Sequence, residues 1–150
     1  MKFLITGGAG FIGSELVRHI ISSTDHEIIN IDALTYAGNL DSLNAINHSS
    51  RYKFKKLDIC NYENLDKIIS ESQPDFIMHL AAESHVDRSI ESPDQFIKTN
   101  IIGTFNILNA SLKYLSTLSR EKKANFRFHH ISTDEVYGDL GRGSKEKFSE

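Results

Sequence analysis

Short β-branched runs alternate along this chain with longer segments in which apolar residues recur at helical spacing. The runs cover residues 2–6, 27–31, 52–57, 75–80 and 126–132, and each is expected to form a strand. Helical spacing between the first two runs is seen at Ile12, Leu16 and Ile20. Parallel strands need such crossover helices, so the alternation predicts an α/β fold with a doubly wound parallel sheet.

A second helix is expected around residues 65–69, and a long one from about Pro93 to Leu118. The long helix is more apolar than one face of a sheet requires, so we expect self-association through it. Its apolar stripe consists of Ile97, Ile101, Phe105, Leu108 and Leu112. No repeat or linker divides residues 1–150, which are expected to form one domain, with residues 139–150 as a mobile tail.

Composition excludes several classes of protein. The chain of 150 residues has a net charge of -3 and no basic run, which argues against nucleic acid as a partner. No apolar stretch is long enough to cross a membrane, and Thr6 and the glycines interrupt the apolar N-terminus before it reaches signal-peptide length. The single cysteine, Cys60, and the lack of a Cys/His cluster favour a cytoplasmic protein without a metal site.

The first candidate site is a glycine-rich turn between the first strand and the first helix. Gly7, Gly10 and Gly13 follow the strand at residues 2–6 and open the helix, where backbone N–H groups and the helix dipole favour a pyrophosphate. Asp32 lies 19 residues beyond Gly13 (32 − 13 = 19), the spacing of an acid that binds the adenosine ribose. Its carboxylate would repel a 2′-phosphate, so NAD is favoured over NADP.

Several segments resemble a known family. Besides the glycine turn, these are Leu34 to Asn39, Leu80 to Ser89, and Ser132 to Gly138. Together they are similar to the dTDP-glucose 4,6-dehydratases, which are extended short-chain dehydrogenases/reductases. The match spans the whole chain and implies NAD as cofactor, dTDP-glucose as the nucleotide-sugar substrate, and a homodimer formed through the long helix. Many members carry Lys after the ribose-binding Asp, whereas this chain has Ala33.

The resemblance also implies roles for individual residues. It puts Phe11 and Ile12 at the pyrophosphate, Asp32 to Thr35 at the adenosine ribose, and Asp58 with Ile59 at the adenine. Leu80 to Ser84 would line the nicotinamide side, with Thr99 nearby. The full set of expected cofactor-binding residues is therefore Gly7, Gly10, Phe11, Ile12, Gly13, Asp32, Ala33, Leu34, Thr35, Asp58, Ile59, Leu80, Ala81, Ala82, Glu83, Ser84 and Thr99. For Asp58 alone, a solvated strand-end carboxylate is an equal alternative.

The resemblance further implies residues of the sugar site at Ser84, His85, Ser132 and Thr133. A dehydration needs one carboxyl to remove a proton from carbon and another to protonate the departing hydroxyl. The resemblance gives these tasks to Glu135 at C5 and Asp134 at the C6 hydroxyl, with Thr133 bonded to O4. The alternative role of Asp134 and Glu135 is to cap a loop or helix, and His85 could equally be a structural histidine. His79, inside an apolar run, is expected to be a satisfied core histidine.

One departure from the family is large. Its members use a Tyr-x-x-x-Lys pair on the helix after the fifth strand, and the only such spacing here is Tyr52 to Lys56, inside the predicted third strand. The chain therefore resembles the N-terminal part of the enzyme, without the C-terminal substrate region, and is expected to be inactive alone. Two alternatives stay open: a related nucleotide-sugar epimerase or decarboxylase, and a non-catalytic NAD-binding module.

Overall fold

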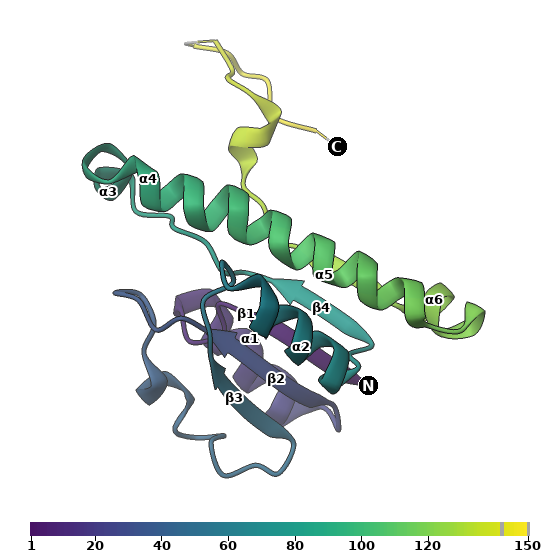
Figure 1. Cartoon of the computed structure of the whole chain (residues 1–150). Coiled ribbons are helices and arrows are strands. Elements are labelled where there is room, and N and C mark those ends of the chain that lie inside the picture. Colours follow the sequence, from purple (N-terminus) through teal and green to yellow (C-terminus); the bar gives the residue numbers. More distant parts are fainter. Residues whose placement is uncertain (142, 150) are drawn as a thin grey trace.

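The computed structural model describes residues 1–141 and 143–149. Its parallel sheet has the strand order β3-β2-β1-β4-β5 (Figure 1). The strands are β1 (Lys2–Thr6), β2 (Glu27–Asp32), β3 (Tyr52–Lys56), β4 (Phe76–His79) and β5 (Arg127–His130). The predicted doubly wound α/β fold is confirmed, and the last three strands are shorter than the sequence indicates: all three end earlier, and β4 and β5 also begin one residue later.

Helices connect the strands and cover both faces of the sheet (Figure 1). The predicted long helix is continuous but not uniform, because residues 97–103 have π-helical geometry between two α-helical parts. The helical elements are α1 (Phe11–Ser23), η1 (Leu40–Leu43), α2 (Tyr62–Ser72), α3 (Val86–Glu91), α4 (Pro93–Phe96), η2 (Ile97–Gly103), α5 (Thr104–Thr117), α6 (Arg120–Asn125) and η3 (Asp134–Tyr137).

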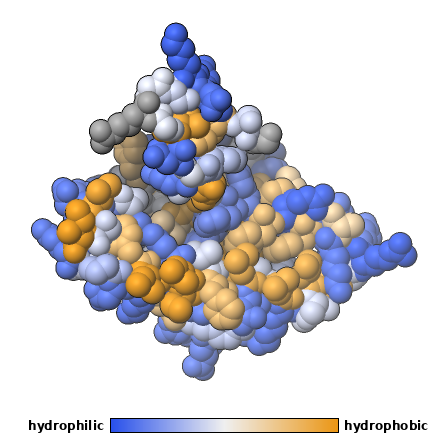
Figure 2. Space-filling model, turned by 90° about the horizontal axis from the view of Figure 1, so that it is seen from above, coloured by the Kyte–Doolittle hydropathy of each residue, from blue (hydrophilic) through white to orange (hydrophobic). Residues whose placement is uncertain are grey.

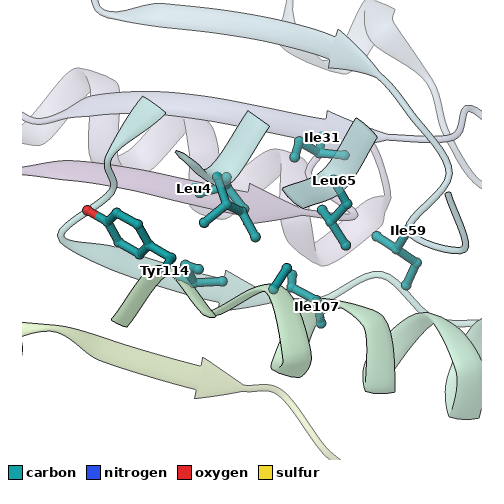
Figure 3. Close-up of a cluster of buried hydrophobic side chains, with 9 residues drawn as sticks. Leu4, Ile31, Ile59, Leu65, Ile107 and Tyr114 are labelled. Atoms are coloured by element: carbon teal, nitrogen blue, oxygen red, sulfur yellow. The ribbon is translucent and has the colours of Figure 1, made fainter. Parts of the chain in front are cut away.

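Two apolar cores lie on opposite faces of the sheet, because successive strand residues point to opposite sides. Leu4 of β1 faces α2 and α5, where it belongs to a cluster with Leu65, Ile107 and Tyr114 (Figure 3). Its neighbour Ile5 faces α1 and the second cluster. The remaining members of that second cluster are Ala9, Val17, Ile20, Ile21, Ile28, Leu43 and Ile46. Both clusters hold the central strands in a three-layer arrangement.

The strand order fixes where a ligand can bind. From β1 the chain moves outward through β2 to β3 and then crosses back to β4 on the other side of β1. The loops after β1 and β4 therefore separate to opposite faces at the carboxyl edge of the sheet, and this switch point is where doubly wound folds bind their ligands. The glycine turn follows β1 at this point.

The segment after β5, which contains η3, leaves the sheet and extends past the long helix (yellow in Figure 1). The predicted mobile tail, residues 139–150, includes Arg142 and Glu150, which lie outside the described residues, so its mobility stays a prediction. Within residues 1–141 and 143–149, no helix is long and apolar enough to span a membrane, and no group of three or more His, Cys, Asp or Glu side chains is placed to hold a metal ion.

Candidate functional site

The turn between β1 and α1 has room only for glycine at its critical positions. Gly7 has a φ of +74°, and a Cβ there would lie 2.6 Å from the backbone nitrogen of Ala81. A Cβ on Gly13 would lie 2.1 Å from the carbonyl oxygen of Gly7. The first contact brings the turn against the loop after β4, and the second brings α1 against the turn itself. Side chains are thus excluded where a ligand's phosphates would approach the backbone.

The N-terminus of α1 is suited to an anion. Its N-cap, Gly10, provides no side-chain cap, and the first turn contains no acidic residue. The backbone N–H groups of this turn consequently lack side-chain acceptors, and the helix dipole adds a partial positive charge. The side chains of Phe11 and Ile12 are 94% and 66% exposed, so they leave the backbone side of the turn open.

The carboxylate of Asp32, at the end of β2, holds the glycine turn. Its Oδ2 accepts a hydrogen bond from the Ala9 N–H (2.9 Å), and its Oδ1 accepts one from the Leu34 N–H (2.8 Å). The side chain is only 9% exposed. A carboxylate has about four acceptor positions, so these two bonds leave capacity for ribose hydroxyls. Sequence spacing predicted the position of Asp32 but not this structural task.

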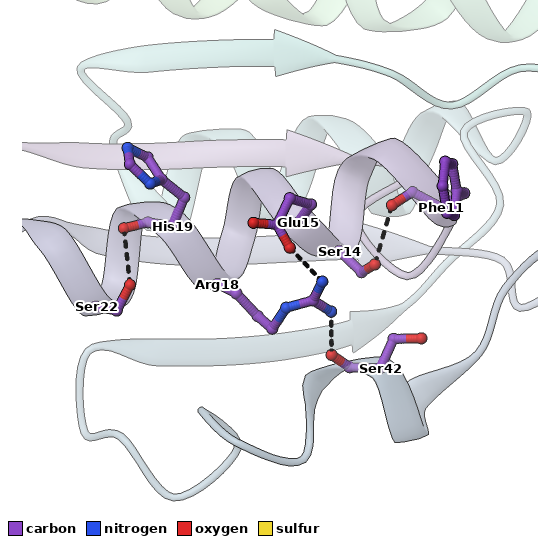
Figure 4. A network of polar contacts seen from close by, with 7 residues as sticks. All are labelled: Phe11, Ser14, Glu15, Arg18, His19, Ser22 and Ser42. Atoms are coloured by element: carbon purple, nitrogen blue, oxygen red, sulfur yellow. Dashed lines mark hydrogen bonds and ion pairs between the residues drawn. The ribbon is translucent and has the colours of Figure 1, made fainter.

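The loop after β2 is held at several points. Gly38 donates to the Thr35 carbonyl (3.1 Å), and Asn39 donates to the Ala9 carbonyl (2.9 Å). Further along, the Arg18 guanidinium of α1 pairs with Glu15 and donates to the carbonyl oxygen of Ser42 in η1 (Figure 4). Residues 33–38, here termed the β2 side of the cleft, are therefore closed by an internal bond and followed directly by anchors to the glycine turn at Asn39 and to α1 at Ser42.

Residues 80–83, the β4 side of the cleft, are held by β1 and by the long helix. The N–H groups of Leu80 and Ala81 donate to the backbone oxygen (3.0 Å) and Oγ1 (3.3 Å) of Thr6. Glu83 and Asn100 bond reciprocally: the Glu83 N–H donates to the Asn100 side-chain oxygen, and the Asn100 amide donates to the Glu83 carbonyl, both at 2.8 Å. The backbone of this side is thus fixed before any ligand binds.

His79, at the end of β4, links β1 to the long helix beneath the β4 side of the cleft. It is fully buried, with Nδ1 2.7 Å from Thr6 Oγ1 and Nε2 3.0 Å from Thr104 Oγ1. Burial, with a smaller contribution from the charge of His130, lowers the pKa of His79 to about 4. The prediction of a satisfied core histidine is confirmed.

The two sides and the glycine turn enclose one cleft at the switch point. The structure brings twelve of the predicted cofactor residues together in its lining: Gly7, Gly10, Asp32, Ala33, Thr35, Asp58, Ile59, Leu80, Ala81, Ala82, Glu83 and Thr99. The other five, Phe11, Ile12, Gly13, Leu34 and Ser84, are not part of the lining. Gly13 and Leu34 instead shape the turn and the loop beneath it.

Five further residues of the lining were not predicted from the sequence: Ile31, Ala37, Gly38, Leu57 and Gln95. The position of Gly38 was indicated by the segment Leu34 to Asn39, but nothing in the sequence distinguishes Gln95 on α4. Among the described residues that line the cleft, three are acidic and none is Lys or Arg. A group carrying extra negative charge, such as a 2′-phosphate, is therefore disfavoured.

The predicted sugar-site and acid/base residues lie apart from this cleft. Thr133 is the N-cap of η3, and Asp134 and Glu135 form its first turn; all three side chains are exposed. None of them, nor Ser132, is part of the described cleft lining. Ser84 and His85 are exposed at the start of the segment after the β4 side. The roles expected for these residues stay predictions.

Comparisons with known proteins agree with this architecture. The sequence pattern of the family described as GDP-mannose 4,6 dehydratase matches residues 4–150. The chain is 62% identical over 140 residues to dTDP-glucose 4,6-dehydratase of Salmonella typhimurium, an alignment that covers 93% of this chain and 39% of that protein. The chain thus spans about two-fifths of the length of this relative.

Two solved structures are similar to the fold. Bacillus anthracis dTDP-glucose 4,6-dehydratase in complex with NAD matches with a TM-score of 0.78 and 39% identity, covering 98% of this chain and 42% of that one. The Streptomyces venezuelae dTDP-glucose 4,6-dehydratase with NAD and TYD bound gives a TM-score of 0.81 at 39% identity, covering 96% and 43%. The resemblance drawn from the sequence is confirmed, and the chain belongs to the GDP-mannose 4,6 dehydratase family.

Proposed function

We propose that the cleft binds NAD and that residues 1–150 form the cofactor-binding unit of a dTDP-glucose 4,6-dehydratase. The observation that carries the proposal is Asp32, whose buried carboxylate ends β2 beside the glycine turn and has acceptor capacity to spare. The turn gives phosphates access to backbone N–H groups. Bound NAD would accept a hydride from C4 of the sugar and return it later at C6. Relatives of known structure carry NAD, which supports the same cofactor here.

Calorimetric titration of the chain with NAD and NADP tests the cofactor. We expect NAD to bind more tightly, because the lining has acidic groups and no cation to neutralise a 2′-phosphate. Asp32→Asn should reduce the preference, since the amide loses the negative charge but keeps an acceptor oxygen. Equal or tighter binding of NADP by the unaltered chain would contradict the proposal.

For the complete enzyme we propose dehydration of dTDP-glucose with Asp134 and Glu135 as the acid/base pair. Asp134 protonates the departing C6 hydroxyl, Glu135 removes the C5 proton, and Thr133 bonds the sugar O4. Two adjacent carboxyl groups support a dehydratase over a related epimerase or decarboxylase. Those enzymes usually carry small uncharged residues at the positions of Asp134 and Glu135. In the longer protein, either carboxyl replaced by its amide should slow water elimination more than C4 oxidation.

Residues 1–150 alone are proposed not to turn over dTDP-glucose. Their only Tyr-x-x-x-Lys spacing, Tyr52 to Lys56, lies on β3, where the two side chains stand about 13 Å apart along the strand. A general base contributes about 10²- to 10⁴-fold to a rate. Without the tyrosine base of a Tyr-x-x-x-Lys pair, residues 1–150 should therefore show no measurable turnover. Detection of a 4-keto-6-deoxy product from this chain would contradict the proposal.

A homodimer through the long helix is also proposed. Ile97, Ile101, Phe105 and Leu112 are 56–65% exposed, and Ile102 and Leu108 extend the same surface. Figure 2, which looks onto the molecule from above the long helix, shows hydrophobic residues gathered across this face. Exposed apolar area of this kind favours association. Sedimentation at high protein concentration tests the homodimer, and a strictly monomeric species would contradict it.

We also propose that the protein is cytoplasmic, because its sequence contains a single cysteine and therefore no pair that could form an internal disulfide.

A further inference from the structure

One arginine contacts both sides of the cleft. Arg88 lies on α3, just after the β4 side, and its guanidinium carbon is 4.2 Å from the centre of the Tyr36 ring. Tyr36 belongs to the β2 side, between Thr35 and Ala37, which both line the cleft. The same arginine's Nε is 3.8 Å from Oε2 of Glu83 on the β4 side.

The buried end of this connection is fixed. Glu83 is only 9% exposed, and its backbone is held by Asn100 through the two reciprocal hydrogen bonds. Its Oε2 has no hydrogen-bond partner among the described residues, so the arginine is the cation placed to compensate its charge. A carboxylate in this position attracts a guanidinium more strongly than one in open solvent would.

The outer end is exposed and adjustable. The Arg88 side chain is 44% exposed, and the Tyr36 residue is 50% exposed. The His85 ring adds an edge-to-face contact with Tyr36 at 6.4 Å. No residue of the six-residue helix α3 is buried, so few packing contacts oppose a movement of Arg88. A connection of this kind can open without disturbing either apolar core.

We propose that Tyr36, Glu83 and Arg88 form a latch that joins the two sides of the cleft and slows the release of bound NAD. The inference rests on the proposed NAD function. It also fits the proposed reaction, in which the hydride removed from C4 is returned at C6. Because the cofactor ends each cycle in its starting oxidation state, turnover does not require its release, and slow release does not limit the rate.

The test is the dissociation rate of NAD from the chain, followed by displacement in a stopped-flow instrument. Arg88→Met removes the charge but keeps an unbranched side chain, and Tyr36→Leu removes the aromatic ring. Each should raise the dissociation rate about 3- to 10-fold, since Arg88→Met loses both the cation–π contact and the half-exposed ion pair, and Tyr36→Leu loses the cation–π contact. The double variant should be no faster than the faster single variant, because the contacts form one unit.

Arg120→Met is the matched control. It is the same change on an exposed arginine of α6, at the opposite end of the long helix from α3 (Figure 1). It should leave the dissociation rate unchanged. An equal increase in this control would overturn the latch.

A second measurement separates the latch from the proposed function. In the cofactor-free chain, amide hydrogen exchange in residues 33–39 should be faster in Arg88→Met than in the unaltered chain. If NAD binds but neither the dissociation rate nor the exchange changes, the latch is wrong and the NAD proposal stands. If the unaltered chain binds no NAD at all, the proposed function fails, and the latch fails with it as a cofactor-retaining device.

Discussion

His79 should make the stability of this fold decrease as the pH falls below about 6.5. The folded state holds the imidazole neutral, with its pKa lowered from 6.5 to about 4, chiefly by burial. The unfolded chain binds a proton at the ordinary pKa. Between these two pH values the unfolded state therefore binds more protons than the folded state, and the free energy of unfolding rises with pH.

The magnitude follows from the two pKa values. A pKa difference of one corresponds to about 1.4 kcal/mol, so the contribution of His79 has a limit of about 3 kcal/mol well below pH 4. At pH 5 an unfolded histidine is almost fully protonated, whereas folded His79 is mostly neutral. The loss of stability between pH 7.5 and pH 5 that belongs to this residue is therefore about 2 kcal/mol.

Comparison of the unaltered chain with His79→Gln isolates this contribution from the other titrating groups. Glutamine does not titrate, and its amide can still reach one of the hydroxyls of Thr6 and Thr104. The chain contains no tryptophan, so urea unfolding is best followed by circular dichroism at pH 7.5 and pH 5. His48→Gln, at an exposed position, is the matched control and should show the pH dependence of the unaltered chain.

We expect the variant to be less stable at pH 7.5, because a buried hydrogen bond is lost, but to lose about 2 kcal/mol less than the unaltered chain on acidification. If the two proteins lose the same stability between the two pH values, the lowered pKa of His79 is wrong.

Three further outcomes are expected. Gly13→Ala should weaken NAD binding by about tenfold or more in calorimetry, since its Cβ would lie 2.1 Å from the Gly7 oxygen and displace the turn; unchanged affinity would disprove this reading of the turn. Leu65→Ala should reduce the free energy of unfolding by about 2–5 kcal/mol in urea titrations, because the side chain is fully buried. Leu112→Lys should prevent self-association in sedimentation while the circular dichroism spectrum stays the same, since this side chain is 65% exposed; persistent association would place the interface elsewhere.

The fold could be predicted because its pattern is local. Alternating strands and amphipathic helices are visible in short windows, and parallel crossovers leave few arrangements for them. The π-helical geometry of Ile97–Gly103 could not be predicted, because its apolar residues have the same spacing as those of an ordinary α-helix. Short helices such as α3 carry too few residues for any periodicity to appear.

The candidate site likewise contains residues that could be predicted from the sequence and contacts that could not. The glycine turn and Asp32 are linked by a fixed spacing across one βαβ unit, so sequence reasoning finds them. The contact between Tyr36 and Arg88 joins loops after two different strands, and no local pattern signals it. Thr133, Asp134 and Glu135 were predicted as a group at the end of the fifth strand; the structure has them just after it, on an exposed segment outside the cleft lining.

The geometry of the cleft is determined by backbone hydrogen bonds between neighbouring strand ends. Gly7 donates to the carbonyl oxygen of Ile31 at the end of β2 (2.9 Å), while Thr6, at the end of β1, accepts from the N–H of Leu80 after β4. Three adjacent strands are thereby tied at the edge where the ligand would lie, and Asp32 adds its carboxylate to the same turn. Since these bonds belong to the sheet, the site is formed when the fold forms, and a ligand bears little of the cost of ordering it.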